Sequence, residues 1–272
     1  AICIFTGVVD ISNTDFINNT GEIGGAIAQE DGILYVNKSR FINNNVTKES
    51  FGDEGGLGGA IAVEDGTLYV EDSKFYNNAG VNGGALGILH GNTVIKSSKF
   101  TNNIAQSNGG AIFQDIGDLI IDNSVFSDNL AIGNNSGFDG YGGAIYKHEG
   151  LLSINDTVFS GNDGFIGGAI DIGGATDIEN DTIASEVIIT NSKFTDNSAI
   201  YGGGLFGWFG DIIIENSTFQ DNSAEVGGGI GLFSGELNVI GSIFRNNNVL
   251  KNTSITGDSL GGAIAIEDAI LN

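Results

Sequence analysis

The sequence predicts an all-β protein that folds as a right-handed parallel β-helix of about nine to ten rungs. Two motifs carry this prediction, Gly-Gly-(Ala/Gly)-(Ile/Leu) and Phe-x-x-Asn, which alternate nine times along the 272 residues. Each Gly-Gly lies 17 residues before the next Phe, with one interval of 27. The unit is therefore about 25 residues long and carries occasional insertions. The chain also has no proline, as expected where every strand needs its N–H group for parallel pairing.

Each repeat is expected to contain about three short strands. The first follows the Gly-Gly motif, as in Gly58-Gly59-Ala60-Ile61, and the fourth motif residue should face the core. A glycine then marks a turn, and alternation such as Leu68-x-Val70 predicts a second strand with one buried face. A Ser or Thr stands two places before each Phe, and Phe-x-x-Asn closes the unit.

Stacking of successive coils would align each motif residue with its copies above and below, at the strand spacing of roughly 4.8 Å. We expect the Phe rings to stack on one another. Asn tolerates turn dihedrals, and its amide can bond to neighbouring coils. The predicted structural ladder consists of Phe16, Asn19, Phe41, Asn44, Phe75, Asn78, Phe100, Asn103, Phe126, Asn129, Phe159, Asn162, Phe194, Asn197, Phe219, Asn222, Phe244 and Asn247.

The pattern indicates one domain over residues 1–272, which we expect to be truncated mid-coil at both ends. Ala1-Ile2 aligns with Ala26-Ile27, and the last residues fall inside the next strand. We therefore interpret the chain as a segment of a longer solenoid. Insertions near 46–55, 131–139, 173–182 and 249–258 interrupt the repeat. The first, second and fourth of these emerge at one corner, either as a partner surface or as tolerated loops.

Composition excludes several classes. Asp and Glu number 34 against 10 Lys and Arg, a net charge of -24, which argues against nucleic-acid binding. No apolar run reaches about 18 residues, so no transmembrane helix is predicted. Forty per cent apolar residues is too many for a disordered acidic tail. Cys3 has no second cysteine with which to form an internal disulfide.

The paired Gly-Gly-Ala-(Ile/Leu) and Phe-x-x-Asn motifs resemble the passenger domains of chlamydial polymorphic outer membrane proteins and related adhesin-like surface proteins. The resemblance extends over essentially the whole chain, although near-absence of cysteine departs from the chlamydial pattern. It implies an extracellular surface protein, anchored to the outer membrane or cell wall through other parts. Its implied role is adhesion to a host or neighbouring-cell surface protein or glycan. The motif residues are architectural, so the resemblance assigns no binding site.

Aromatic residues gather on one part of the repeat and are the candidate contact residues: Phe206, Trp208, Phe209 and Phe233. Alternation along the first strand predicts that Phe206 and Trp208 point outward. An exposed platform of this kind suits sugar stacking or a protein hot spot. The alternative is that the third insertion along the chain folds over these residues and buries them.

Carboxylates at alternate positions make a possible calcium site at Asp177, Glu179 and Asp181, since hard cations take several oxygens from one short segment. The spacing is not that of an EF-hand, and a solvated acidic loop is the alternative. The pairs Glu30-Asp31 and Glu64-Asp65 occupy the same columns on adjacent rungs. They either share a cation or splay into water. No other cofactor is predicted.

No catalytic residues are predicted, and the chain is not expected to be an enzyme. Arg40 and Arg245 share a column but lie seven rungs apart, and His90 and His148 lie on non-adjacent rungs. Two alternatives stay open. One is a polysaccharide lyase or glycoside hydrolase of the β-helix type, because two carboxylates about 5–10 Å apart can cleave a glycosidic bond. The other is a self-associating surface filament subunit.

Overall fold

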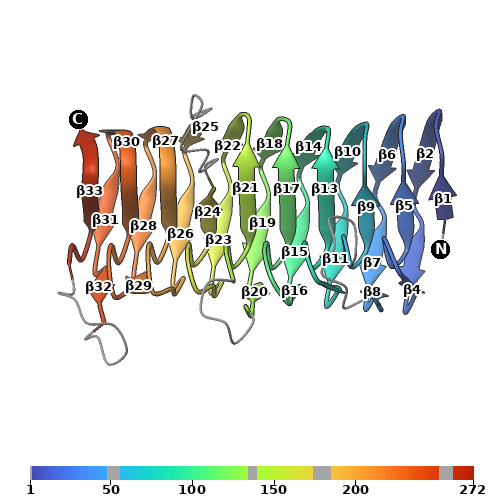
Figure 1. Cartoon of the computed structure of the whole chain (residues 1–272), viewed down its shortest axis with the longest axis horizontal. Coiled ribbons are helices and arrows are strands. Elements are labelled where there is room, and N and C mark those ends of the chain that lie inside the picture. The colour runs from blue at the N-terminus through green and yellow to red at the C-terminus, as the bar shows by residue number, and fades with distance from the viewer. Residues whose placement is uncertain (1, 48–55, 134–139, 174–184, 251–259) are drawn as a thin grey trace, which may run out of the picture.

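The computed structural model describes residues 2–47, 56–133, 140–173, 185–250 and 260–272. These residues form a rod of stacked coils, with the two chain ends at opposite ends of the rod (Figure 1). Strands of successive coils pair in parallel and in register, for example Phe75 with Phe100. The parallel β-helix predicted from the repeat is therefore confirmed.

Among the described residues, the largest sheet has 17 strands and contains two strand positions of each coil. The first position is formed by β1 (Ile2–Ile4), β5 (Ile27–Gln29), β9 (Ile61–Val63), β13 (Leu86–His90), β17 (Ile112–Ile116), β21 (Ile145–Glu149) and β24 (Ile170–Ile172). The second is formed by β2 (Val8–Ser12), β6 (Ile33–Asn37), β10 (Thr67–Glu71), β14 (Asn92–Lys96), β18 (Leu119–Asp122), β22 (Leu152–Asn155) and β25 (Ser185–Thr190). Both positions merge into one long strand in β27 (Leu205–Glu215), β30 (Ile230–Ile240) and β33 (Ile264–Leu271).

Two further faces complete each coil. The nine-stranded Phe sheet comprises β3 (Asp15–Ile17), β7 (Arg40–Ile42), β11 (Lys74–Tyr76), β15 (Lys99–Thr101), β19 (Val125–Ser127), β23 (Val158–Ser160), β26 (Lys193–Thr195), β28 (Thr218–Gln220) and β31 (Ile243–Arg245). The short sheet after it comprises β4 (Thr20–Gly21), β8 (Asn45–Val46), β12 (Ala79–Gly80), β16 (Ile104–Ala105) and β20 (Leu130–Ala131). The pair β29 (Ser223–Ala224) and β32 (Asn248–Val249) continues this position.

The core is built from columns of identical or similar apolar residues. The fourth residue of the Gly-Gly motif is fully buried from Ile27 to Ile230, as expected. The Phe rings stack with centroids between 4.4 Å and 5.1 Å apart, which is the strand spacing. Stacked aromatic surfaces of this kind remove large apolar areas from water.

The Asn column forms the predicted ladder of hydrogen bonds between coils. The side-chain oxygen of Asn103 accepts hydrogen bonds from both the backbone N–H and the side-chain amide of Asn78, at 3.1 Å and 3.0 Å. The Asn103 amide in turn donates to Asn129 Oδ1 and to the Phe75 carbonyl. The ladder Asn itself does not adopt the turn dihedral. The preceding residue does, as at Asn102 with φ 54°.

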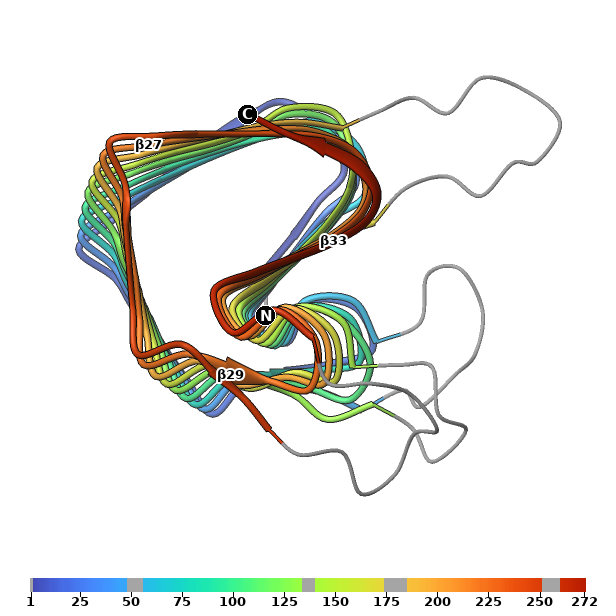
Figure 2. The same ribbon diagram turned by 90° about the vertical axis from the view of Figure 1, so that its left-hand side faces the viewer.

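The Gly-Gly motif bends each coil inward, which gives the cross-section an indentation on one side (Figure 2). The second glycine makes this bend possible because it packs directly on the backbone of the short sheet. At Gly110 an added Cβ would lie 2.7 Å from the backbone of Leu130 and 2.0 Å from the Gly143 carbonyl oxygen of the next coil. The described residues contain no helix of a length and apolar character that could cross a membrane.

Candidate functional site

The indented face carries the least repetitive side chains of the rod and is the candidate site. We define it as the outward side of the first-position strands together with the residues just before each Gly-Gly. Those preceding residues form their own parallel column, in which Tyr141 pairs with Ile166 and Ile166 with Tyr201. Because outward side chains here vary from Ala28 to Phe206, this face differs in chemistry along the rod.

The predicted aromatic residues lie at the C-terminal end of the indented face. Phe206 points outward from its strand but is buried, with its ring 5.9 Å from Tyr201. Trp208 is half-buried and contacts Phe206 edge-on at 5.2 Å and Phe233 at 6.1 Å. Phe233 is exposed and lies 6.0 Å from Phe209. Three of the four residues, Trp208, Phe209 and Phe233, therefore form a partly exposed aromatic cluster.

A polar group lies in the middle of the same face and was not predicted as a unit. His148 Nδ1 and Asp115 Oδ1 are 2.6 Å apart, and this hydrogen bond raises the pKa of His148. Tyr146 stacks on Phe113, with centroids 5.4 Å apart, and burial raises the pKa of its hydroxyl. The group is built on β17 and β21, whose side chains meet because the strands pair in register.

Asp171 completes this group as a buried acid. Its residue pairs with Tyr146 on one side and Phe206 on the other, and it has no exposed surface. Neither carboxyl oxygen has a hydrogen-bond partner among the described residues. Burial therefore raises the pKa of Asp171 well above its ordinary value, and the protonated form is favoured. An alignment of the repeats could have revealed Asp171 as unusual, because other members of its strand column are the uncharged residues Ala62, Phe113 and Tyr146.

The buried carboxyl of Asp171 should make stability depend on pH. In the unfolded chain it ionises above its ordinary pKa of 3.8, whereas the folded chain keeps the proton until its raised pKa. The folded state therefore loses up to about 1.4 kcal/mol of stability per pH unit as pH rises through this interval. We expect Asp171→Asn to be more stable than the native chain at pH 7, with a smaller difference at pH 5. Urea unfolding at both values measures this.

The exposed Asp211 provides the control for this comparison. Asp211→Asn removes the same charge from the adjacent strand β27 but relieves no buried group. Its difference from the native chain should change much less between pH 5 and pH 7. An Asp171→Asn variant that follows Asp211→Asn at both values would show that the Asp171 carboxyl titrates normally.

Lys147 faces the core beside this polar group, in the same column as Gln29 and Gln114. It is fully buried, and its ammonium donates to the carbonyl oxygens of Glu149 and Asp115 at the corner of the coil. The amides of Gln29 and Gln114 donate to corner carbonyls in the same way, but their side-chain oxygens have no hydrogen-bond partner within the described part of the chain. Polar side chains in this column donate hydrogen bonds to the corner carbonyls. Lysine can do so without leaving a buried acceptor unpaired, because its ammonium has no acceptor.

The buried ammonium of Lys147 also predicts a pH effect at alkaline pH. Burial lowers the pKa of Lys147 from 10.5 to about 8. Below pH 8 both states carry the proton and the folded state bears the cost of desolvating the charge, which is relieved between pH 8 and 10.5. The native chain should therefore gain up to about 3 kcal/mol relative to Lys147→Met across this interval.

Denaturant unfolding of the native chain and of Lys147→Met at pH 7.5 and 10 measures this gain. The matched control is Lys99→Met, because Lys99 is exposed on the Phe sheet and does not bear that cost. Its stability should run parallel to that of the native chain. If Lys147→Met also runs parallel, the ammonium of Lys147 is solvated rather than buried.

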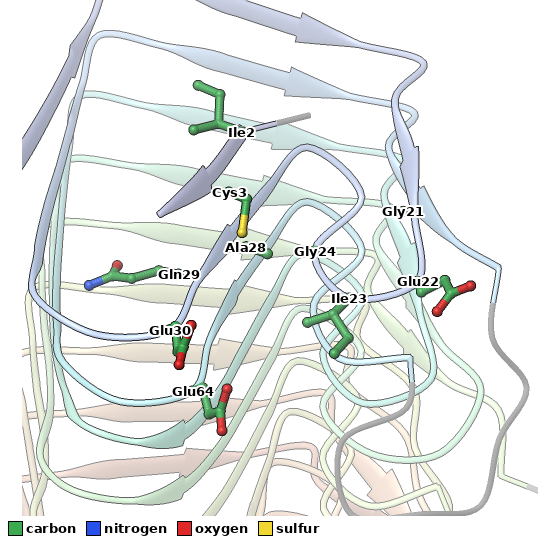
Figure 3. Close-up of a pocket in the computed structure, with 10 residues that line it drawn as sticks. All are labelled: Ile2, Cys3, Gly21, Glu22, Ile23, Gly24, Ala28, Gln29, Glu30 and Glu64. Atoms are coloured by element: carbon green, nitrogen blue, oxygen red, sulfur yellow. The ribbon is translucent and has the colours of Figure 1, made fainter. Parts of the chain in front are cut away.

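A hollow of about 400 Å³ opens at the N-terminal end of the indented face (Figure 3). It lies between β1, β5 and the turn that precedes Gly24. Ala28 and the exposed Ile23 contribute apolar surface to it. Glu22, Glu30 and Glu64 also line it, and all three residues are exposed.

The predicted calcium ligands Asp177, Glu179 and Asp181 lie outside the described residues, as does most of each insertion. Glu30 and Glu64 do lie on adjacent coils, since the Asp65 N–H donates to the Glu30 carbonyl at 2.8 Å. All four members of the two acidic pairs are exposed. Within the ranges that the structure describes, no three His, Cys, Asp or Glu side chains are grouped to hold a metal ion.

One stretch of the rod matches a known type of repeat. It runs through β15, β16 and into β17, and contains both the Phe100-x-x-Asn103 element and the Gly109-Gly110 bend. Residues 97–115 match the Chlamydia polymorphic membrane protein repeat. The polymorphic membrane protein repeat is generally found in non-enzymatic passenger domains of outer-membrane or surface proteins. No curated protein and no solved structure matches the chain significantly.

The His residues of the indented face lie apart from one another. His90 and His148 lie on β13 and β21, which are separated by β17, so they do not share a site. Of the two His–Asp pairs among the described residues, His148–Asp115 at 2.6 Å is within hydrogen-bond distance and resembles acid–base machinery, whereas His90 and Asp65 are 3.8 Å apart. Tyr146 beside it stays neutral because its pKa is raised, and the ammonium of Lys147 is directed to the opposite side of the strand.

Proposed function

We propose that the chain is the adhesive part of a surface passenger and binds a protein or glycan of a host or neighbouring cell through its aromatic cluster. The observation that carries the proposal is the contact between Trp208 and Phe233 on adjacent coils, where both rings keep exposed surface. Elsewhere the recurring residues are accounted for by stacking. These rings break the repeat, and nothing in the ladder requires them.

Physical chemistry favours this cluster as a contact surface. Trp and Tyr-like aromatic residues supply large contact areas with few rotatable bonds, and they dominate the binding energy of many interfaces. Sugar rings also stack on exposed aromatic faces. The half-buried Trp208 is held by Phe206, which is itself fixed beneath Tyr201. The ring is therefore oriented before a partner arrives, which lowers the entropic cost of binding.

The proposal is tested by binding of the whole chain to intact cells and to a glycan array. We expect Trp208→Ala combined with Phe233→Ala to lower affinity at least tenfold. The matched control is Tyr35→Ala combined with Tyr69→Ala, an exposed stacked pair on the second-position strands, with rings 4.9 Å apart. Retained binding by the first variant, or equal losses in both, would overturn the role of the aromatic cluster.

A carbohydrate-active enzyme is the second candidate, favoured by the His148–Asp115 pair beside Tyr146. The test is incubation of the chain with a panel of polysaccharides, with assays for new reducing ends and unsaturated products. Activity that is lost in His148→Gln would support the enzyme. If no product forms with any polysaccharide of the panel, the result favours the adhesive function over the enzyme.

A further inference from the structure

We propose that Asp171 is a pH-sensitive positioning residue for the aromatic cluster: its protonated carboxyl lets Phe206 pack and hold Trp208, and its ionised carboxylate releases both rings. The inference rests on the proposed function, because it concerns the regulation of that same cluster. The contact surface is then ordered at acidic pH and loosened as the pH rises.

The carboxyl of Asp171 lies in a place that suits its neutral form. The residue has no exposed surface, and neither carboxyl oxygen has a hydrogen-bond partner among the described residues. Burial without a partner disfavours a carboxylate far more than a neutral carboxyl. Ionisation therefore requires water to reach the side chain, so a neighbour that covers Asp171 must move.

Other charges do not relieve this demand. The ammonium of Lys147 faces the core and donates to corner carbonyls, and His148 is already paired with Asp115. The tyrosines nearby carry no positive charge. The titratable residues of the neighbouring strands, and of the positions just before each Gly-Gly, are Tyr146, Lys147, His148 and Glu149 of β21, Asp115 of β17, Asp211 and Glu215 of β27, Tyr141 and Tyr201.

Phe206 is the neighbour that can yield. Asp171 pairs with Tyr146 on one side and with Phe206 on the other. Tyr146 is held by stacking on Phe113 and on further rings of the indented face. The Phe206 ring lies over Gly231 of the next coil, where an added Cβ would meet its Cδ2 atom at 2.7 Å. Because glycine has no side chain to retain the ring, Phe206 can move away and admit water to Asp171.

Trp208 depends on Phe206 for its orientation. The two rings meet edge-on, with centroids 5.2 Å apart and an interplanar angle of 80°. When Phe206 moves, Trp208 gains rotamer freedom, which raises the entropic cost of binding a partner. Chains with a protonated Asp171 are the binding-competent fraction. Affinity should therefore fall by up to about tenfold per pH unit once the pH exceeds the pKa of Asp171.

Fluorescence of the whole chain tests this switch directly, because Trp208 is its one tryptophan. From pH 5 to pH 9 the native emission maximum should shift to longer wavelength, and quenching by acrylamide should increase. Asp171→Asn carries a neutral amide at every pH and should keep the short-wavelength emission throughout. A flat native profile, or an Asp171→Asn profile that follows the native one, would overturn the inference.

Two control variants remove other groups that titrate in this range. The pKa of His148 is raised by its hydrogen bond to Asp115, and that of Lys147 is lowered by burial to about 8. His148→Gln and Lys147→Met should both keep the native fluorescence profile. If either of them abolished it and Asp171→Asn did not, the sensor would be that residue instead. Far-UV circular dichroism should stay constant, and a fluorescence change that accompanies its loss would reflect unfolding and count against the switch.

Binding to intact cells and to a glycan array at pH 5 and pH 9 separates this inference from the proposed function. The native chain should bind at least tenfold more weakly at pH 9, and Asp171→Asn should bind equally at both values. Native binding that does not change with pH would leave the proposed function standing and overturn the regulation. If the fluorescence profile is as expected but no cell or glycan binds, the proposed function fails while control of the cluster by Asp171 is supported.

Discussion

Asn103→Leu should destabilise the rod by roughly 2–6 kcal/mol, because it leaves buried polar groups of neighbouring coils without partners. Leucine keeps the number of side-chain heavy atoms and the branched shape but removes both the amide and its oxygen. The backbone N–H of Asn78 and one of its side-chain N–H groups both lose the Asn103 oxygen that accepts them. The Phe75 carbonyl loses a donor as well. Urea unfolding measures the total loss, and hydrogen exchange should show faster exchange at the Asn78 amide.

The control is the neighbouring residue Asn102, which is exposed and has φ 54°. Asn102→Gly removes an amide side chain while keeping a residue that tolerates the left-handed conformation. We expect its stability to stay within about 1 kcal/mol of the native chain. If Asn103→Leu lost no more stability than Asn102→Gly, the ladder amides would be replaceable by apolar packing.

The spacing of the motifs predicted the fold because residues that lie one repeat apart in the sequence pair with each other in neighbouring strands. Phe75 pairs with Phe100 and Phe100 with Phe126, as the alignment of motifs required. The Asn column was also predictable, since a buried amide needs partners and identical residues in adjacent coils supply them. The turn residue was assigned one position too late, however. Asn102 rather than Asn103 takes the left-handed conformation, and both positions can carry Asn.

The indented face could not be predicted from the motifs, because backbone atoms form the contact that creates it. Gly110 meets Leu130, twenty residues along the chain, and no side-chain pattern records such a contact. The covering of Phe206 by Tyr201 has the same origin. The alternation of residues along the strand correctly predicted that Phe206 points outward. It is nevertheless buried, because outward residues of the first-position strands face the bent part of their own coil.

In the sequence, the polar group could be recognised only from residues that differ in type from the other members of their strand columns. Asp171 and Lys147 are charged residues in columns that otherwise hold apolar residues, Gly, Cys or Gln. Sequence alone could mark them as unusual but could not distinguish a buried acid from a loop residue, because an insertion follows Asp171 closely. Register supplied the distinction by placing Asp171 between Tyr146 and Phe206.

Gly110→Ala should cost about 3 kcal/mol or more, which is the upper end of the range for overpacked interiors. One methyl group there would lie 2.0 Å from the Gly143 carbonyl oxygen and 2.7 Å from the backbone of Leu130. Backbone atoms cannot rotate away as a side chain can, so two coils and the short sheet must separate. The expected result is a lower urea midpoint, together with faster exchange of the amides that pair β16 with β20.

A glycine that meets only side chains provides the comparison. At Gly207 an added Cβ would approach the ends of the Leu232 and Ile212 side chains, at 2.9 Å and 3.0 Å. Those side chains can change rotamer, so Gly207→Ala should lose less than half the stability that Gly110→Ala loses. Equal losses would mean that crowding of the core, rather than the backbone contact at the Gly-Gly bend, limits what this position accepts. The backbone contact of the second glycine would then not be what sets the cost of a side chain at the bend.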